Sequence, residues 1–229
     1  MASSRYLWGD DKMDPRVWMF CVLLWSPAVS TASLMCTDGP GAPGTTFEDL
    51  RWIITSTLLV ALSIYSINTF NVSIKTTGSS AAAIAISERC MVNTIETQPI
   101  VLAMIWIHAV LFDANTAGAL GLQYSIARLL YPYFYGVYGE YTMMIQFNSQ
   151  VWWLAQYLLF TNLSMKVLLD VNLLGLLGQN PLYLFLASLG VGIVMIFVQL
   201  PFGMTYFKVT KAGCQWKESA ESIAHLQMA

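Results

Sequence analysis

Long apolar stretches separated by short polar segments dominate this chain. Residues 52–74 contain no charged side chain and lie between Arg51 and Lys75. About 20 apolar residues cross the hydrocarbon core as a helix, so this stretch predicts a membrane span. The same pattern predicts further spans at about 88–112, 117–138 and 180–206. A less regular span at 150–174 is interrupted by Lys166 and Asp170, which are four residues apart and can pair on one helix face.

The segments outside these spans are more polar or more ambiguous. Residues 76–87 are rich in Gly, Ser and Ala and are expected to form a connector. Residues 17–37 carry no charge and follow three basic residues, a pattern typical of a signal peptide. A first transmembrane or interfacial helix, kinked at Pro27, is the other interpretation. The sequence leaves both open.

Composition supports a membrane protein. Of the 229 residues, 56% are apolar and 10% charged, whereas a soluble domain carries roughly 25% charged residues. We therefore predict an all-α, polytopic transmembrane helical bundle, multi-pass and in contact with the lipid bilayer. The net charge of -2 argues against nucleic acid as a partner. The four cysteines lack the spacing of a metal or redox motif, and no metal site is expected.

A first polar cluster lies at the start of the second predicted span. Arg89, Asn93 and Glu96 are at positions i, i+4 and i+7, which places them on one helix face. Charges inside a membrane are expensive and commonly functional. Arg89 can bind a carboxylate through two hydrogen bonds, and Glu96 can accept from an ammonium group. A zwitterionic ligand fits this face, although the same residues could instead pair with neighbouring helices.

A second cluster lies one span later. Arg128, Tyr131 and Tyr135 are at i, i+3 and i+7, again on one face. Tyrosine hydroxyls there can donate to a ligand or a thiolate, but tyrosine is also common at the membrane interface. Pro132 removes the usual partner of the Arg128 carbonyl and can kink the helix.

Together the two clusters resemble the MAPEG family, the membrane-associated proteins of eicosanoid and glutathione metabolism. The segment Glu88-Arg89, Asn93, Glu96 and Pro99 resembles its ER-x-x-x-N-x-x-E-x-x-P signature. The later segment Ala127-Arg128-Leu129-Leu130-Tyr131, followed by Tyr135, resembles its A-R-x-x-Y-x-x-x-Y segment. The resemblance covers about residues 50–145.

The resemblance implies a fold, a cofactor and an assembly. We expect a MAPEG-like four-helix core at 47–145, after an N-terminal segment at 1–46. Further transmembrane helices are expected at 146–207 and a solvated tail at 208–229. Family members are trimers that bind glutathione between subunits near the cytosolic face. By matching, Arg89, Asn93, Glu96 and Arg128 would bind the glutathione cofactor, and Tyr131 or Tyr135 would act on its sulfur.

One departure leaves the function open. Glutathione-conjugating members carry an arginine about two turns after the tyrosines, and a nearby cation stabilises a thiolate. Residues 136–142 read GVYGEYT, with Glu140 and no basic residue. One interpretation is a glutathione-dependent transferase or peroxidase acting on lipophilic small molecules. The other is a non-catalytic accessory subunit, or a lipid-binding component of a larger membrane complex.

Overall fold

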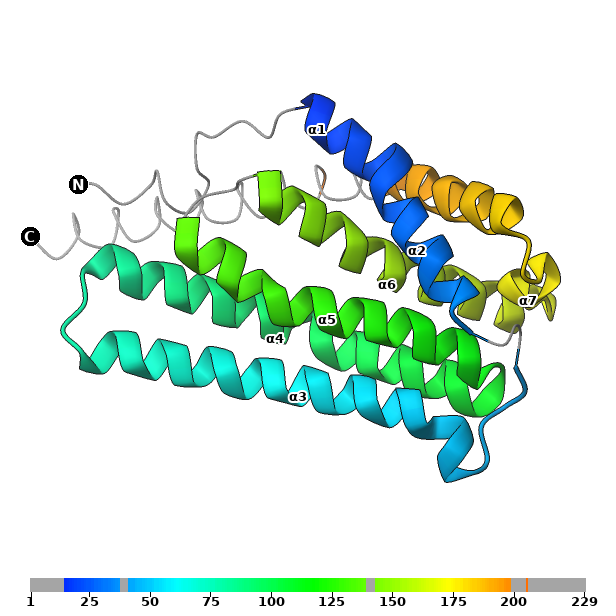
Figure 1. The fold of residues 1–229 in the computed structure, drawn as a ribbon, viewed down its shortest axis with the longest axis horizontal. Coiled ribbons are helices and arrows are strands. Elements are labelled where there is room, and N and C mark those ends of the chain that lie inside the picture. The colour runs from blue at the N-terminus through cyan, green and yellow to red at the C-terminus, as the bar shows by residue number, and fades with distance from the viewer. Residues whose placement is uncertain (1–14, 38–40, 139–142, 199–204, 206–229) are drawn as a thin grey trace, which may run out of the picture. The chain divides into compact units, whose positions relative to one another are not determined.

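A computed structural model of the chain describes residues 15–37, 41–138, 143–198 and 205, and the all-α prediction is confirmed there (Figure 1). The chain divides into two compact units, residues 1–192 and 193–229, and every labelled helix belongs to the first. These elements are α1 (Pro15–Phe20), the π-helical turn η1 (Cys21–Trp25), α2 (Ser26–Met35), α3 (Phe47–Thr76), α4 (Ala81–Leu111), α5 (Ala114–Tyr138), α6 (Met143–Leu169) and α7 (Leu173–Leu177).

Four described helices are long and apolar enough to cross a membrane, which confirms a multi-pass integral membrane protein. They are Arg16–Met35, Phe47–Thr76, Ala81–Leu111 and Pro181–Val198. The predicted spans at 117–138 and 150–174 correspond to α5 and α6, which are not among the four. Both helices have the length to cross, with 25 and 27 residues. They carry more polar side chains, many of them buried inside the bundle.

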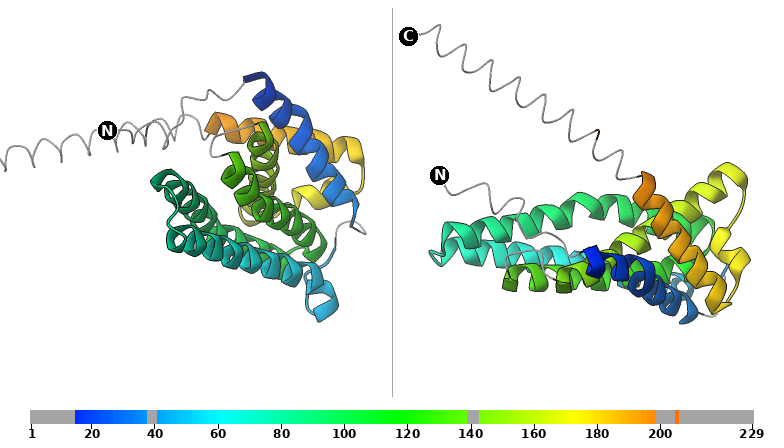
Figure 2. Two further views of the ribbon diagram at one scale, coloured as in Figure 1. Left: turned by 60° about the vertical axis from the view of Figure 1, so that its left-hand side comes forward. Right: turned by 90° about the horizontal axis from the view of Figure 1, so that it is seen from above.

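Helices α3 to α6 form a bundle in which each helix follows the last through a short connection (Figures 1 and 2). Helix α5 is central, because it packs against α3, α4 and α6. This arrangement is the up-and-down pattern expected of consecutive helices with short loops. The expected boundary at residues 145 and 146 falls inside α6, so the fourth helix of the bundle extends to Leu169.

Small residues allow the helices to approach closely. The buried positions of α3 are spaced by three and four residues, the pattern of left-handed helix packing: Ile53, Ser56, Val60, Ser63 and Ile67. Where α5 crosses α3, a Cβ added to Gly121 would lie 2.9 Å from the Ser56 hydroxyl oxygen. The Ser125 hydroxyl donates to the Ser56 carbonyl oxygen at 3.0 Å. Such small and hydroxylated residues are the usual means of helix association in lipid.

The expected connector at 76–87 is wrong for its second half. Helix α4 begins at Ala81, and the Ser80 hydroxyl accepts from the backbone N–H of Ala83. Serine is a preferred N-cap, and alanine has the highest helix propensity. The run of alanines therefore belongs to the helix, and the connection to α3 is short.

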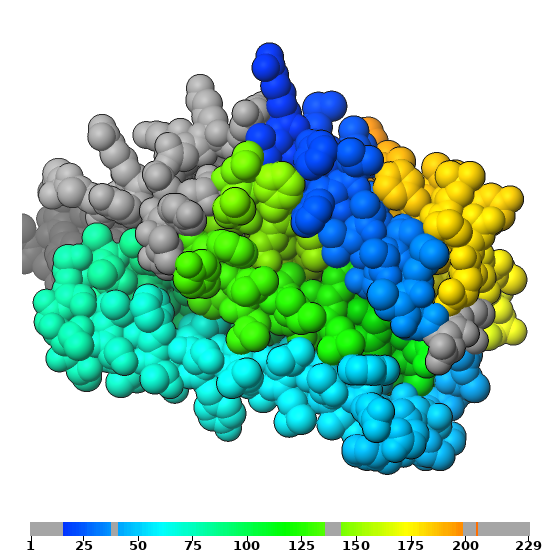
Figure 3. Space-filling view, viewed as in Figure 1, coloured from blue at the N-terminus to red at the C-terminus, as the bar shows by residue number. Residues whose placement is uncertain are grey.

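The N-terminal segment forms a packed helix. The turn η1 ends two residues before Pro27, whose missing N–H and ring disrupt regular α-helical hydrogen bonding over the preceding turn. The Trp25 indole N–H donates to the Phe147 carbonyl oxygen at 3.1 Å, and Gln123 donates to the Ser30 hydroxyl at 2.8 Å. Figure 3 shows this helix, in blue, lying against the green α5 and α6. Its removal as a signal peptide stays a prediction.

A buried polar network joins the C-terminal parts of α4 and α6. Nδ1 of His108 lies 3.1 Å from the Asp113 carbonyl oxygen, and Nε2 lies 2.6 Å from the amide nitrogen of Asn162. Asn162 also donates to Asn172 and accepts from the backbone N–H of Leu174. His108, a lone histidine in an apolar stretch, is thus a hydrogen-bonded packing residue.

Helix α6 ends in a left-handed cap. Asp170 has φ 55°, and its N–H donates to the Lys166 carbonyl oxygen at 3.0 Å. The predicted pair of Lys166 and Asp170 forms, with 2.5 Å between Nζ and Oδ1. Asp170 makes this contact from just beyond the helix. The Lys166 ammonium holds the pKa of the Asp170 carboxyl below its usual range.

Candidate functional site

The centre of the candidate site is Arg128, which is fully buried on α5. Its Nη1 donates to the side-chain oxygen of Asn93 at 2.8 Å. Its Nη2 donates to the Asn93 carbonyl oxygen and, at 2.9 Å, to the Thr97 hydroxyl. Only Nε lacks a hydrogen-bond partner among the described residues. The two predicted clusters therefore meet, with α5 anchored to α4 through one guanidinium group.

Aromatic rings enclose this cation. The guanidinium carbon lies 4.3 Å from the ring centroid of Trp152 on α6, 5.6 Å from Tyr131 and 6.0 Å from Tyr124. Ring faces attract cations, and more strongly when water is excluded. Among the described residues, no carboxylate forms an ion pair with Arg128. The charge is therefore stabilised by neutral acceptors and π faces.

The rest of the first cluster lies toward the outside of the protomer. Glu96 is exposed and Arg89 is half-buried, and neither forms an ion pair with a described residue. Glu96 lies within electrostatic range of Arg128. Arg89 and Glu96 are thus the two charged members of the cluster that no described residue of the chain pairs.

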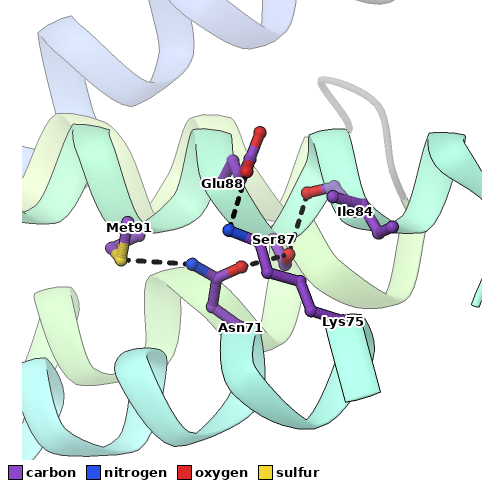
Figure 4. A network of polar contacts seen from close by, with 6 residues as sticks. All are labelled: Asn71, Lys75, Ile84, Ser87, Glu88 and Met91. Carbon is purple, nitrogen blue, oxygen red and sulfur yellow. Dashed lines mark hydrogen bonds and ion pairs between the residues drawn. The ribbon is translucent and has the colours of Figure 1, made fainter. Parts of the chain in front are cut away.

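A polar network joins the end of α3 to the first turns of α4, next to Arg89 (Figure 4). Glu88 forms an ion pair with Lys75 at 2.8 Å, so its carboxylate is already used. The Ser87 hydroxyl donates to the side-chain oxygen of Asn71 at 3.0 Å, and the Asn71 amide lies 3.3 Å from the Met91 sulfur. These contacts join the end of α3 to α4 and set the rotation of α4 at Arg89.

The two tyrosines form a stacked pair beside the guanidinium. The rings of Tyr131 and Tyr135 are 5.8 Å apart and nearly parallel. Tyr131 is buried and Tyr135 half-buried. Arg89 lies within electrostatic range of both, as does the buried thiol of Cys90. Tyr135 is therefore the tyrosine that a molecule bound outside the protomer can reach.

Three residues of the site were missed in the sequence, namely Thr97, Tyr124 and Trp152. Thr97 accepts from Arg128 and lies 3.1 Å from the Tyr124 hydroxyl oxygen, so it joins the cation to a second phenol. Its signal was available, because it lies four residues after Asn93 on the same face. Trp152 comes from α6, and only the register between α5 and α6 brings it to Arg128. Glu140, at the position of the missing arginine, lies outside the described residues.

Comparison with known proteins supports the resemblance seen in the two motifs. The model of the MAPEG family matches residues 52–169, just over half of the chain and nearly all of α3 to α6. No curated protein matches the chain, and no solved structure does. On the family match, the helical bundle and the membrane spans, this chain belongs to the MAPEG family.

Proposed function

We propose that this protein binds glutathione on the face formed by α4 and α5 and uses its thiol against lipophilic electrophiles or peroxides. The proposal rests on one observation, an exposed carboxylate at the centre of a membrane-spanning helix. Glu96 is the sixteenth of the 31 residues of α4. Such a helix is about 46 Å long, whereas the hydrocarbon core is about 30 Å thick. Any placement of α4 across the membrane therefore leaves Glu96 at hydrocarbon depth.

An exposed carboxylate at that depth must be shielded from the lipid hydrocarbon. Translocon insertion scales put the cost of a charged side chain at the centre of a span at about 3 kcal/mol. A neighbouring subunit together with a polar ligand removes the carboxylate from lipid and gives it a donor. Glutathione has an ammonium group for Glu96 and carboxylates for Arg89. This requirement favours the homotrimer that the family resemblance implies.

The chemistry of the thiol would depend on Tyr135. A phenol O–H donates a hydrogen bond to a thiolate and so stabilises it, though less than a full positive charge does. In this proposal Arg128 acts indirectly, through the positions of other residues. It is buried against Asn93 and Thr97, so it positions α4 relative to the tyrosines. We assign it as a positioning residue.

A non-catalytic role is the second candidate, and the same arginine favours it. Both terminal nitrogens of Arg128 are engaged within the protomer, so they are not available to activate a thiol bound beside the tyrosine pair. A MAPEG scaffold without an activating cation can still bind a ligand or a partner protein. An accessory subunit or lipid-binding component would keep the binding face and lack turnover.

The test measures binding and turnover separately on the full chain purified in detergent. We expect glutathione binding by calorimetry, and glutathione-dependent consumption of a generic aromatic electrophile or a lipid hydroperoxide. Glu96→Gln should weaken binding about tenfold through loss of a charge-assisted hydrogen bond. Tyr135→Phe should lower turnover and leave binding intact. Val110→Leu, at an exposed position of α4 about 21 Å along the helix from Glu96, is the matched control.

The outcomes separate the candidates. Binding without turnover supports the non-catalytic role, whereas absence of binding refutes the glutathione proposal. Chemical cross-linking in native membranes tests the assembly, for which we expect trimers. Co-migration with a much larger complex would support the accessory role.

A further inference from the structure

Tyr65 is an exposed phenol in the membrane-spanning part of α3. Its side chain is 71% exposed, and its hydroxyl forms no hydrogen bond with a described residue. Tyr65 lies about 27 Å from the start of a helix of 30 residues that can cross the membrane. Because the hydrocarbon core is about 30 Å thick, any placement of α3 across the membrane leaves Tyr65 at hydrocarbon depth, as is also true of Glu96 on α4. A phenol O–H away from water usually has a hydrogen-bond partner, so this one requires an acceptor from outside the protomer.

Tyr65 and Glu96 lie at the same level of the α3–α4 hairpin. The two helices are antiparallel and pack side by side (Figure 1). The Gln98 amide nitrogen donates to the Ser63 hydroxyl at 3.1 Å, and this contact fixes their register. Two residues back along α4 and two residues on along α3 lead to Glu96 and Tyr65, each about 3 Å further in the same direction. The protomer therefore presents one donor and one acceptor at one depth.

Both side chains point away from the bundle. Tyr65 is two residues from the buried Ser63, and Glu96 is two residues from the buried Gln98. A step of two residues turns a helix by about 200°, so each exposed side chain lies on the side opposite to the buried one. No hydrogen bond joins Tyr65 to Glu96 within the protomer. The donor and the acceptor are thus both directed toward a second molecule.

Tyr65 belongs to a row of exposed residues with the spacing of a helix–helix seam. The row has alternating steps of four and three residues along α3 and consists of Leu58, Leu62, Tyr65, Thr69 and Val72. Apolar side chains with this spacing form the line on which a second helix packs. A partner helix that packs along this row therefore contacts the phenol.

No exposed cation of α3 can take the place of the phenol at Glu96. Arg51 and Lys75 lie near the two ends of the helix and are paired with carboxylates within the protomer. Asn68 is exposed, but it lies about one turn away from the level of Glu96. Tyr65 is therefore the long donor side chain of α3 at the level where the carboxylate needs one.

We propose that Tyr65 of one copy of this chain donates a hydrogen bond to Glu96 of a neighbouring copy, with α3 packed on α4 across the interface. Copies related by an axis along the membrane normal hold equivalent residues at equal depth, so a donor and an acceptor at one level can meet between copies. Because the two residues lie on different helices, the contact is heterologous and can close into a ring. The inference rests on the second subunit of the proposed function but not on glutathione, since a carboxylate can accept from the phenol and from a ligand ammonium group together.

Photo-cross-linking of the full chain in membranes without glutathione tests the contact. Benzoylphenylalanine, a photoreactive analogue of tyrosine, is incorporated in place of Tyr65. We expect a cross-linked dimer on a denaturing gel, with the link on residues 92–100 of α4 by mass spectrometry. The same analogue in place of Tyr133, which is 66% exposed on α5, is the matched control and should not give that link. Absence of the dimer, or links that avoid α4, overturns the contact.

Removal of a single hydroxyl group tests the hydrogen bond itself. Tyr65→Phe should raise the concentration at which the oligomer dissociates in detergent by about tenfold, because a charge-assisted hydrogen bond is lost. Tyr133→Phe removes a similarly exposed hydroxyl and should leave that concentration unchanged. In a Glu96→Leu background, Tyr65→Phe should have little further effect. Dissociation of Tyr65→Phe at the wild-type concentration, or additive effects of the two changes, overturns the hydrogen bond.

The outcomes also separate this contact from the proposed function. Trimers on chemical cross-linking without the link from Tyr65 to α4 refute the contact and leave the proposed assembly standing. The link without any glutathione binding supports the contact and refutes the glutathione proposal.

Discussion

Asn93 and Arg128 should be energetically coupled, so that replacing both harms this protein less than the two single replacements added together. Asn93→Leu removes the side-chain acceptor of Arg128 and leaves a buried cation with one donor unpaired. A hydrogen bond to a charged group contributes roughly 1.5–3 kcal/mol, so we expect a loss of about 2 kcal/mol in the free energy of unfolding. Arg128→Met removes the charge together with its desolvation cost, but it also leaves the Asn93 side-chain oxygen and the Thr97 hydroxyl without this donor. A buried acceptor left unpaired costs roughly 1–3 kcal/mol, so we expect a loss of about 2 kcal/mol here too.

The double variant makes the reasoning falsifiable. Once Arg128 is methionine, Asn93 has no cation to satisfy, so Asn93→Leu should cost little more in that background. Equilibrium unfolding in mixed micelles measures all four free energies, and the double-mutant cycle should give a coupling above about 1 kcal/mol. Val110→Leu, at an exposed position of α4 distant from Asn93, should be silent. Additive single effects would refute the assigned role of Asn93.

Four further predictions concern the helix ends and the helix crossing. The Asp170→Gly variant should have a higher melting temperature than Asp170→Ala, because both lose the ion pair but only glycine relieves the strain of the positive φ. The reverse order of melting temperatures would contradict a left-handed cap. Lys166 lowers the pKa of Asp170, so the ion pair stabilises the fold fully at pH values above the ordinary pKa range of Asp. This stabilisation is lost as the pH falls below that range. In a pH series of melting temperatures, the advantage of the wild type over Asp170→Asn should therefore vanish only at such acidic pH. Asn162→Leu should cost about 2–3 kcal/mol by leaving His108 Nε2 and a backbone N–H unpaired, and a chemical-denaturation loss below 1 kcal/mol would count against that network. Gly121→Val should separate α5 from α3 and lower the melting temperature, whereas an unchanged value would mean that the contact is not close.

The sequence predicted the helices well and their partners poorly. Apolar length alone located α3, because a span leaves a clear run without charges. The predicted start of α4 was too late in the chain, because the alanine-rich first turns of this helix resemble a linker in composition. The helix positions of Arg89, Asn93 and Glu96 followed from periodicity. Which of them faces inward did not follow, because that depends on the rotation of α4 against α5.

The site shows the same limit. Arg128 was expected to bind a ligand, and its full burial against Asn93 depends on packing that no single helix encodes. That prediction of a cofactor contact stays untested, as do those for Tyr131 and Tyr135. Trp152 could not be assigned, because its contact requires the register of α6.

The partners of Arg128 have a consequence for biogenesis. Helix α4 leaves the ribosome before α5, so Asn93 and Thr97 are available when the arginine reaches the membrane. A lone α5 would have to insert a bare cation into lipid, whereas an α4–α5 hairpin inserts it already hydrogen-bonded. Trp152 arrives last and closes the aromatic enclosure. The order of the helices along the chain thus supplies each partner at about the time that the translocating segment needs it.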